Sequence, residues 1–157
     1  MENHPKQPED DYWMDQAISL AKRAEAMGEV PVGAVVVQDG RVIGAGFNQL
    51  ICDNDPTAHA EIIALRAAGR QVGNYRLPGA TLYVTLEPCS MCAGAIISAR
   101  LARVVYATPD PRTGAAGSVF QVLDNAQLNH RCRVTTGVRT QQAADMLRAF
   151  FRARRRT

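Results

Sequence analysis

Residues 12–27 carry apolar side chains at the spacing of a helix that packs one face against a core. The repeat of three and four residues is made by Trp13, Ala17, Leu20, Ala21 and Ala24. Asp10 or Asp11 is placed to cap the first turn, and Gly28 follows the last one. The pattern predicts an amphipathic helix.

The next apolar positions are denser and follow a strand pattern. Residues 32–38 and 41–47 hold five valines together with Ile43 and Phe47, and Asp39-Gly40 joins the two runs. Because an Asp-Gly pair suits the turn that matches strand twist, the two runs predict a β-hairpin. Asn, Asp and Pro then predict a loop over residues 48–56.

The remaining pattern alternates helices with strands. Thr57 is placed to cap a helix over residues 57–68. Strands are expected over residues 81–86, 103–107 and 132–136, and helices over residues 89–99, 119–123 and 141–155. A loop rich in Pro and Gly is expected over residues 109–117.

This order of elements predicts an α/β fold with three layers, in which helices cover both faces of a mixed five-stranded sheet. Helices between the later strands imply that these strands are parallel neighbours. The helices that begin near His59 and Cys89 can then lie side by side, with their first residues close together.

Two short motifs supply candidate chemistry. One is His-x-Glu at His59 and Glu61, and the other is Pro-Cys-x-x-Cys at residues 88–92. His59, Cys89 and Cys92 are suitable zinc ligands, and three protein ligands leave the fourth position open for water. Glu61 is close enough to exchange protons with that water without binding the metal. Either motif alone is weak, since a lone Cys-x-x-Cys is also typical of redox pairs and of buried cysteines.

Composition bounds the class of protein. The 157 residues are 46% hydrophobic, which suits a single domain over residues 12–157 after a disordered tail at residues 1–11. The sequence contains no run of about 18 apolar residues, so no membrane span is expected. The polar start and four cysteines predict a cytoplasmic protein with reduced thiols. Cys52 and Cys132 stand alone and are interpreted as small core or surface residues, not as metal ligands.

Charge is concentrated at one end of the chain. Five arginines lie in the last ten residues, and the other 147 residues hold 13 basic and 15 acidic side chains. A basic end on a slightly acidic body favours a polyanionic partner such as nucleic acid, with a solvated tail as the alternative.

Longer blocks of sequence resemble the bacterial tRNA-specific adenosine deaminases, which belong to the cytidine/deoxycytidylate deaminase superfamily. The resemblance runs from about residue 12 to residue 155 and rests on residues 29–35, 55–61, 74–77, 80–95, 113–118 and 129–131. It implies a cytidine-deaminase-like fold, one Zn²⁺ per subunit and a homodimer. It also implies hydrolytic deamination of adenosine to inosine at the wobble position (34) of a tRNA anticodon.

The resemblance also assigns roles to single residues. His59, Cys89 and Cys92 match the zinc ligands, and Glu61 matches the catalytic proton shuttle. The expected contacts to the RNA substrate are Asn48 at the target nucleoside, Asp110 near the preceding ribose, and Phe150, Phe151 and Arg152 at the anticodon loop. The alternative for the aromatic pair is a place in the core. His130 is interpreted as a hydrogen-bonded structural residue, and His4 has no assigned role.

Two rival functions remain open at this point. Deaminases of free bases or nucleotides, such as guanine, cytosine or deoxycytidylate, share the metal motifs but do not need a basic end. A non-catalytic RNA-binding module stabilised by zinc is the second rival. Glu61 argues against the module, because a structural site has no use for a carboxylate beside an open ligand position.

Overall fold

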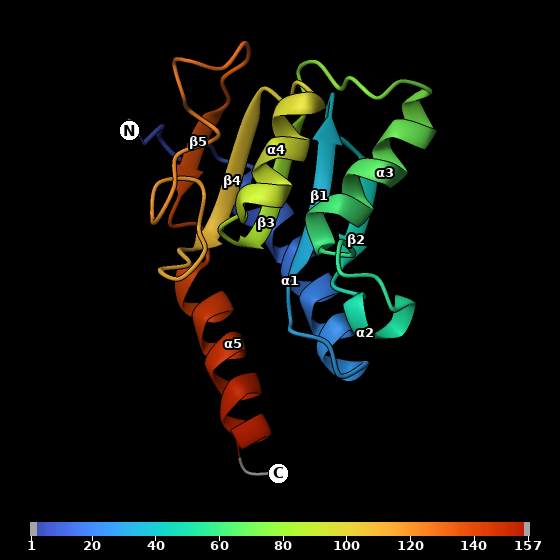
Figure 1. Ribbon diagram of the computed structural model, residues 1–157, viewed down its shortest axis with the longest axis vertical. Helices are drawn as coiled ribbons and strands as arrows, with labels where there is room; N and C mark the ends of the chain where they lie inside the picture. Colours follow the sequence, from blue (N-terminus) through green and yellow to red (C-terminus); the bar gives the residue numbers. More distant parts are fainter. Residues whose placement is uncertain (1–2, 156–157) are drawn as a thin grey trace.

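A five-stranded sheet forms the centre of the computed structural model, which describes residues 3–155 (Figure 1). The strands are β1 Gly33–Gln38, β2 Arg41–Phe47, β3 Thr81–Leu86, β4 Arg103–Thr108 and β5 Arg133–Thr136. Their order is β2-β1-β3-β4-β5, with antiparallel pairing on both sides of β1 and parallel pairing of β4 with β3 and β5. The predicted mixed sheet is confirmed.

Helices cover both faces of this sheet, as predicted. Helices α3 (Ala60–Val72) and α4 (Ser90–Ser98) lie in front of it in Figure 1, and α1 (Asp10–Ala26) lies behind. Side chains alternate along the strands. Val36 and Val84 therefore pack in a core cluster with α3 and α4, whereas Val35 and Tyr83 pack in a second cluster with α1.

Close packing between β2 and α3 fixes where α3 begins. A Cβ at Gly44 would lie 2.3 Å from the carbonyl oxygen of Ala64, and a Cβ at Gly46 would lie 2.7 Å from that of Ala60. Neither distance is possible for real atoms, so only glycine lets the strand approach the helix backbone this closely. The first residues of α3 are thereby held against the sheet.

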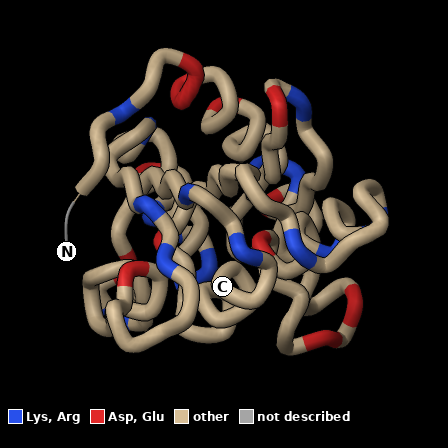
Figure 2. Tube along the Cα trace, turned by 90° about the horizontal axis from the view of Figure 1, so that it is seen from above, with Lys and Arg blue, Asp and Glu red and all other residues tan. Residues whose placement is uncertain are grey.

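Helix α5 (Thr140–Arg155) is packed mainly at its start. Ala143 is buried, and Met146 and Leu147 are partly buried against the two clusters. Figure 1 shows the later turns running past the end of the sheet, and Figure 2 shows basic and acidic positions interspersed over the chain. None of the helices within residues 3–155 combines the length and apolar character needed to cross a bilayer.

The N-terminal segment differs from the expected disordered tail over residues 1–11. Helix α1 already begins at Asp10, and Glu9 rather than an aspartate is its N-cap. Residues 3 and 4 lie against β5: the His4 N–H donates to the Val134 carbonyl at 2.9 Å, and the Thr136 N–H donates to the Asn3 side-chain oxygen at 3.0 Å. These bonds satisfy backbone groups on an otherwise open sheet edge. Residues 1 and 2 lie outside the described part of the chain.

Two helix predictions were wrong in detail. Helix α3 begins at Ala60, because the Thr57 hydroxyl bonds to Asp55 at 2.7 Å and His59 takes the N-cap position. Residues 119–123 form no helix, and the segment between β4 and β5 consists of turns and one isolated bridge. A short helix α2 (Leu50–Asp53) interrupts the expected loop after β2.

A buried ion pair connects α1 to the sheet. The Asp10 carboxylate accepts hydrogen bonds from Arg103 at 2.6 and 2.8 Å and from the Tyr83 hydroxyl at 2.8 Å. Asp10 is fully buried and Arg103 is 2% exposed. Burial raises the pKa of Asp10, but the bonds from Arg103 and the Gln7 N–H outweigh it, and the net pKa is lowered.

We expect Asp10→Asn to lower the free energy of unfolding by about 3–5 kcal/mol, because Arg103 would keep a buried charge without its partner. Urea denaturation at pH 7 measures this loss. Since the folded pKa is lowered, the stabilisation is present above the unfolded value of about 3.9 and is lost as the pH falls through the folded pKa. Asp15→Asn, in an exposed pair with Arg139, is the control and should cost about 0–1 kcal/mol. Equal losses for the two variants would contradict a structural role for the buried pair.

Candidate metal centre and active-site cavity

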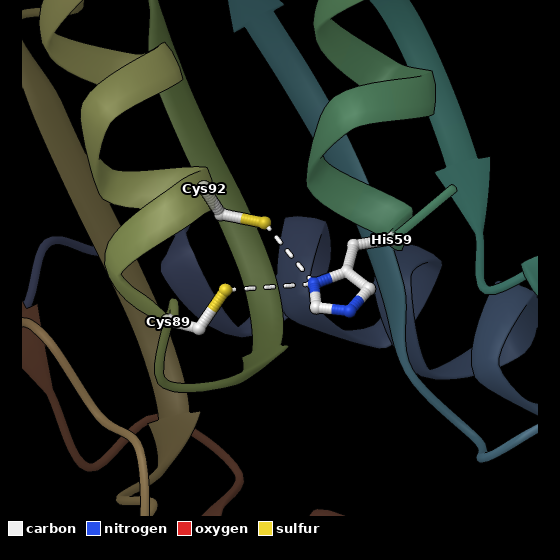
Figure 3. A group of neighbouring side chains, drawn as sticks. All are labelled: His59, Cys89 and Cys92. Atoms are coloured by element: carbon white, nitrogen blue, oxygen red, sulfur yellow. Dashed lines mark hydrogen bonds between the residues drawn. The ribbon is translucent and has the colours of Figure 1, made fainter. Parts of the chain in front are cut away.

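The starts of α3 and α4 bring His59, Cys89 and Cys92 together (Figure 3). His59 is the N-cap of α3, Cys89 is the N-cap of α4, and Cys92 lies in the first turn of α4. The two helices cover the same face of the sheet and begin at the same end of it (Figure 1). The expected convergence of these three residues is present, although Cys89 precedes the helix instead of opening it.

The distances between the three side chains suit a zinc ion. His59 Nδ1 lies 3.3 Å from Cys92 Sγ and 3.6 Å from Cys89 Sγ, and all three ligand atoms lie within 4.8 Å of one another. Tetrahedral zinc, with Zn–S near 2.3 Å and Zn–N near 2.0–2.1 Å, separates sulfur and nitrogen by about 3.6 Å. Within residues 3–155, no other group of three histidine, cysteine or acidic side chains converges in this way.

The electrostatics of the site favour a cation. Hydrogen bonds with Cys92, chiefly, and with His59 together lower the pKa of Cys89 to about 4, against the opposing effect of burial. The pKa of His59 is raised, chiefly by its bond to Cys89. The Cys89 bond and burial together raise the pKa of Cys92. One thiolate is therefore preformed, and a bound metal would ionise the second thiol.

Glu61 lies in the first turn of α3, directly after the His59 cap. Its side chain is 3% exposed, and its Oε1 atom is buried without a hydrogen-bond partner among residues 3–155. Burial raises the pKa of this carboxyl to about 7. A buried carboxyl with one unpartnered oxygen, whose pKa lies near neutrality, can take up and release protons beside a group of candidate metal ligands.

A cavity of about 590 Å³ opens in front of these residues. Most of the residues predicted to form the site line it: Asn48, His59, Glu61, Cys89, Asp110, Phe150 and Phe151. Cys92 is fully buried behind the others. The size and the mixture of aromatic and polar walls suit a small ligand or a single nucleoside.

The C-terminal helix supplies one wall of this cavity. Phe150 is half-buried and Phe151 is 47% exposed, so neither is a core residue. Their rings meet edge to face, with the ring centroids 5.4 Å apart. Arg152 is exposed and does not line the cavity, whereas Arg154 does. Arg154 stacks on the Phe150 ring at 4.6 Å and hydrogen-bonds the Gly28 carbonyl.

Asn48 and Asp110 hold the backbone at opposite sides of the cavity. The Asn48 amide accepts the Ala60 N–H at 2.9 Å and donates to the Val30 carbonyl at 3.1 Å. It therefore caps α3 from outside the helix. The Asp110 carboxylate accepts from the Arg112 N–H at 3.0 Å and the Thr113 hydroxyl at 2.9 Å, which closes its own turn.

Two buried carboxylates beside the cavity were missed from the sequence. Glu29 accepts from the Ile51 and Cys52 N–H groups at 3.1 and 2.8 Å, and Glu87 accepts from the loop after β4. Each is 2% exposed. In the sequence, each is a single acidic residue in an otherwise apolar run. This pattern could have indicated a buried carboxylate with hydrogen-bond partners, because acidic residues are rarely buried without them.

The histidine and cysteine residues outside the site have structural surroundings. His130 Nε2 lies 2.7 Å from the Leu101 carbonyl, which confirms its interpretation as a hydrogen-bonded residue. The buried Cys132 thiol donates to the same carbonyl at 3.1 Å, and Cys52 is exposed.

Comparisons with known proteins agree with this site. Residues 7–108 match the model of the cytidine and deoxycytidylate deaminase zinc-binding region. The tRNA-specific adenosine deaminase of Haemophilus influenzae is 52% identical over 147 residues, which cover 93% of this chain and 85% of that protein.

Solved structures share the fold as well. One from a study of A-to-I editing by tRNA:A34 deaminases at the wobble position of transfer RNA aligns with a TM-score of 0.84 and 44% identity, covering 87% of this chain and 99% of its own. A guanine deaminase from Nitrosomonas europaea aligns with a TM-score of 0.79 but 25% identity, over 94% of this chain and 88% of its own. The chain therefore belongs to the cytidine and deoxycytidylate deaminase family with a zinc-binding region and, within it, to the tRNA-specific adenosine deaminases.

Proposed function

We propose that this protein converts adenosine to inosine at the wobble position (34) of a tRNA anticodon, with water as co-substrate and ammonia as the second product. The observation that carries the proposal is the buried Glu61 carboxyl, which has one unpartnered oxygen and lines the cavity beside three candidate metal ligands. The similarity to tRNA-specific adenosine deaminases supports the choice of substrate.

His59, Cys89 and Cys92 would hold one zinc ion in each subunit. When bound, zinc supplies Lewis-acid activation of the attacking water at neutral pH. The donor set fits this use, because two sulfurs and one imidazole nitrogen leave a coordination position for a small molecule. A fourth protein ligand would be expected at a purely structural site.

Glu61 moves the protons of the reaction. It accepts a proton from the water that adds to C6 of adenine, and it delivers a proton to N1 of the ring. A further proton transfer to the amino group lets the C6–N bond break and ammonia leave. The raised pKa of Glu61, caused by its burial, suits a group that must both gain and lose a proton near pH 7.

The cavity walls would bind the nucleotide that carries the target base. A base must leave its stack to reach the site, which costs least in a single-stranded loop. We assign Asn48 to the target nucleoside, Asp110 to the preceding ribose, and Phe150, Phe151 and the exposed Arg152 to the anticodon loop. Four of these five residues line the cavity, which supports the assignment.

Deamination of free bases is the alternative, and the likeness to a guanine deaminase is the observation that favours it. The wall formed by α5 argues for a larger substrate, because its aromatic and basic side chains extend beyond what a free base would cover. Ammonia release from free bases and nucleosides, compared with release from tRNA, separates the two functions.

We also propose that the protein is a cytoplasmic homodimer, in line with its resemblance to the tRNA-specific adenosine deaminases. Exposed apolar side chains lie on α3 and α4 and in the loop after α3, among them Val72, Met91 and Tyr75. Sedimentation equilibrium compares the mass in solution with the 17.1 kDa of one chain.

Cys89→Ala should lose most of the bound zinc, because the change removes one ligand and leaves only His59 and Cys92. Elemental analysis of purified protein measures the content. Cys132→Ala is the matched control, since Cys132 is also a buried cysteine but lies outside the ligand group. Full zinc in the first variant, or zinc loss in the control, would refute the ligand assignment.

Glu61→Ala should keep zinc and tRNA binding but lower turnover by about a hundredfold to ten-thousandfold, because it removes the proton shuttle. Single-turnover assays with total tRNA, followed by inosine mapping, measure this. The unsubstituted protein should place inosine at position 34. Inosine formation from the variant at a rate near that of the unsubstituted protein would exclude this role for Glu61.

Replacing two exposed arginines of α5, Arg152 and Arg155, by alanine should weaken tRNA binding and reduce its salt dependence. The log–log slope of affinity against salt should fall by about 1.5 units, because each phosphate contact contributes about 0.7–0.9. Arg139→Ala is the control, since Arg139 pairs with Asp15 at the other end of α5. An unchanged slope in the double variant would return free-base deamination to consideration.

A further inference from the structure

Glu87 is a buried carboxylate between the metal site and the wall of the cavity. It follows β3 and directly precedes the Pro88-Cys89 step that leads into α4. Its side chain lines the cavity but is only 2% exposed. Charged groups are rarely buried in this way unless their hydrogen-bonding capacity is satisfied.

Every hydrogen bond to this carboxylate comes from the loop that follows β4. Oε1 accepts from the Asp110 N–H at 3.0 Å and from the Ser118 hydroxyl. Oε2 accepts from the N–H groups of Ala116 and Ser118 at 2.9 and 3.1 Å. Four donors spread over nine residues thus converge on one side chain, and bonds to an ionised acceptor are about twice as strong as neutral ones.

The loop held in this way, residues 110–118, forms part of the cavity. Asp110 and Thr113 line it, and their side chains are joined by a hydrogen bond of 2.9 Å. Packing around the carboxylate is tight, because a Cβ at Gly114 would lie 2.3 Å from Glu87 Cδ. The conformation of the loop therefore depends on both the charge of Glu87 and the absence of a side chain at Gly114.

Backbone bonds tie the same segment to the start of the metal-binding helix. The Glu87 N–H donates to the Thr108 carbonyl at 2.9 Å, and the Ala115 N–H donates to the Pro88 carbonyl at 2.8 Å. The metal ligand Cys89 follows immediately. The segment Glu87-Pro88 is thus bonded to the loop of residues 110–118 and leads directly into Cys89.

We propose that Glu87 is a positioning residue for the RNA substrate, whose carboxylate holds residues 110–118 in the shape that presents Asp110 and Thr113 to the cavity. This inference rests on the proposed function for the identity of the substrate. Glu87 acts through the loop and touches neither the reacting base nor the metal ligands' donor atoms, so its loss affects binding more than chemistry.

Glu87→Gln tests the proposal, because it keeps the size of the side chain but points an amide N–H₂ at backbone N–H groups. With an anticodon stem-loop RNA, KM should rise about tenfold or more, while kcat changes by less than about threefold. Zinc content should stay at the level of the unsubstituted protein. Asp124→Asn, the same change at a carboxylate elsewhere in the β4–β5 connection, should leave both constants unchanged because Asp124 pairs with Arg131.

Gly114→Ala provides a second test that leaves the charge in place. The new methyl group would displace the carboxylate, so the same rise in KM is expected without a change at Glu87. An unchanged KM in both variants, or a fall in kcat at constant KM, would overturn the proposal. Zinc loss in Glu87→Gln would do so as well, because it would show a role in the metal helix.

Amide hydrogen exchange separates this inference from the proposed function. Faster exchange at Ala116 and Ser118 in Glu87→Gln, but not in Asp124→Asn, is expected whether or not tRNA is the substrate. Unchanged exchange would refute the holding role itself. If the unsubstituted protein forms no inosine in tRNA while exchange still responds, the substrate assignment fails and the loop-holding role of Glu87 stands.

Discussion

The site depends on how closely α3 can approach the sheet. Gly44 and Gly46 remove the side chains that would stand between β2 and the backbone of α3. His59, which caps that helix, is therefore held at a fixed height above the strands. Because α4 covers the same face, Cys89 and Cys92 arrive at the same level, and three donor atoms meet without a dedicated metal-binding loop.

Around this rigid base, loops form the cavity and buried acids fix the loops. Glu29 binds two N–H groups at the start of α2, and Glu87 binds the loop after β4. In both cases a buried carboxylate accepts hydrogen bonds from backbone N–H groups that have no backbone partner in a helix or strand. The apolar core determines where the candidate metal ligands lie, whereas these buried carboxylates determine the shape of the loops around the cavity.

Much of this arrangement could be predicted from local pattern. The hairpin at Asp39-Gly40, the strands and the three ligands follow from periodicity and motif spacing, which depend on near neighbours in sequence. The Thr57 cap failed for a local reason, its bond to Asp55, but other failures involve distant partners. The helix expected over residues 119–123 does not form in a segment whose preceding N–H groups, at Ala116 and Ser118, bind Glu87. Asn3 and His4 bond to β5, more than a hundred positions away. Arg154 could be predicted only as one of several C-terminal charges. Its hydrogen bond to the Gly28 carbonyl joins residues far apart in the sequence, and periodicity does not predict such a contact.

The hydrogen bonds to Glu87 divide the long connection between β4 and β5 into two parts. The last contact of Glu87 is at Ser118, but the N–H groups of Val119, Phe120 and Val122 donate to the carbonyls of Gly114 and Ala115, so the held part extends to residue 122. The remaining residues lead into β5, where the Cys132 N–H donates to the Leu123 carbonyl. Within this last stretch residues 126–129 are exposed, which makes them the place where a label or an inserted peptide would least reshape the cavity.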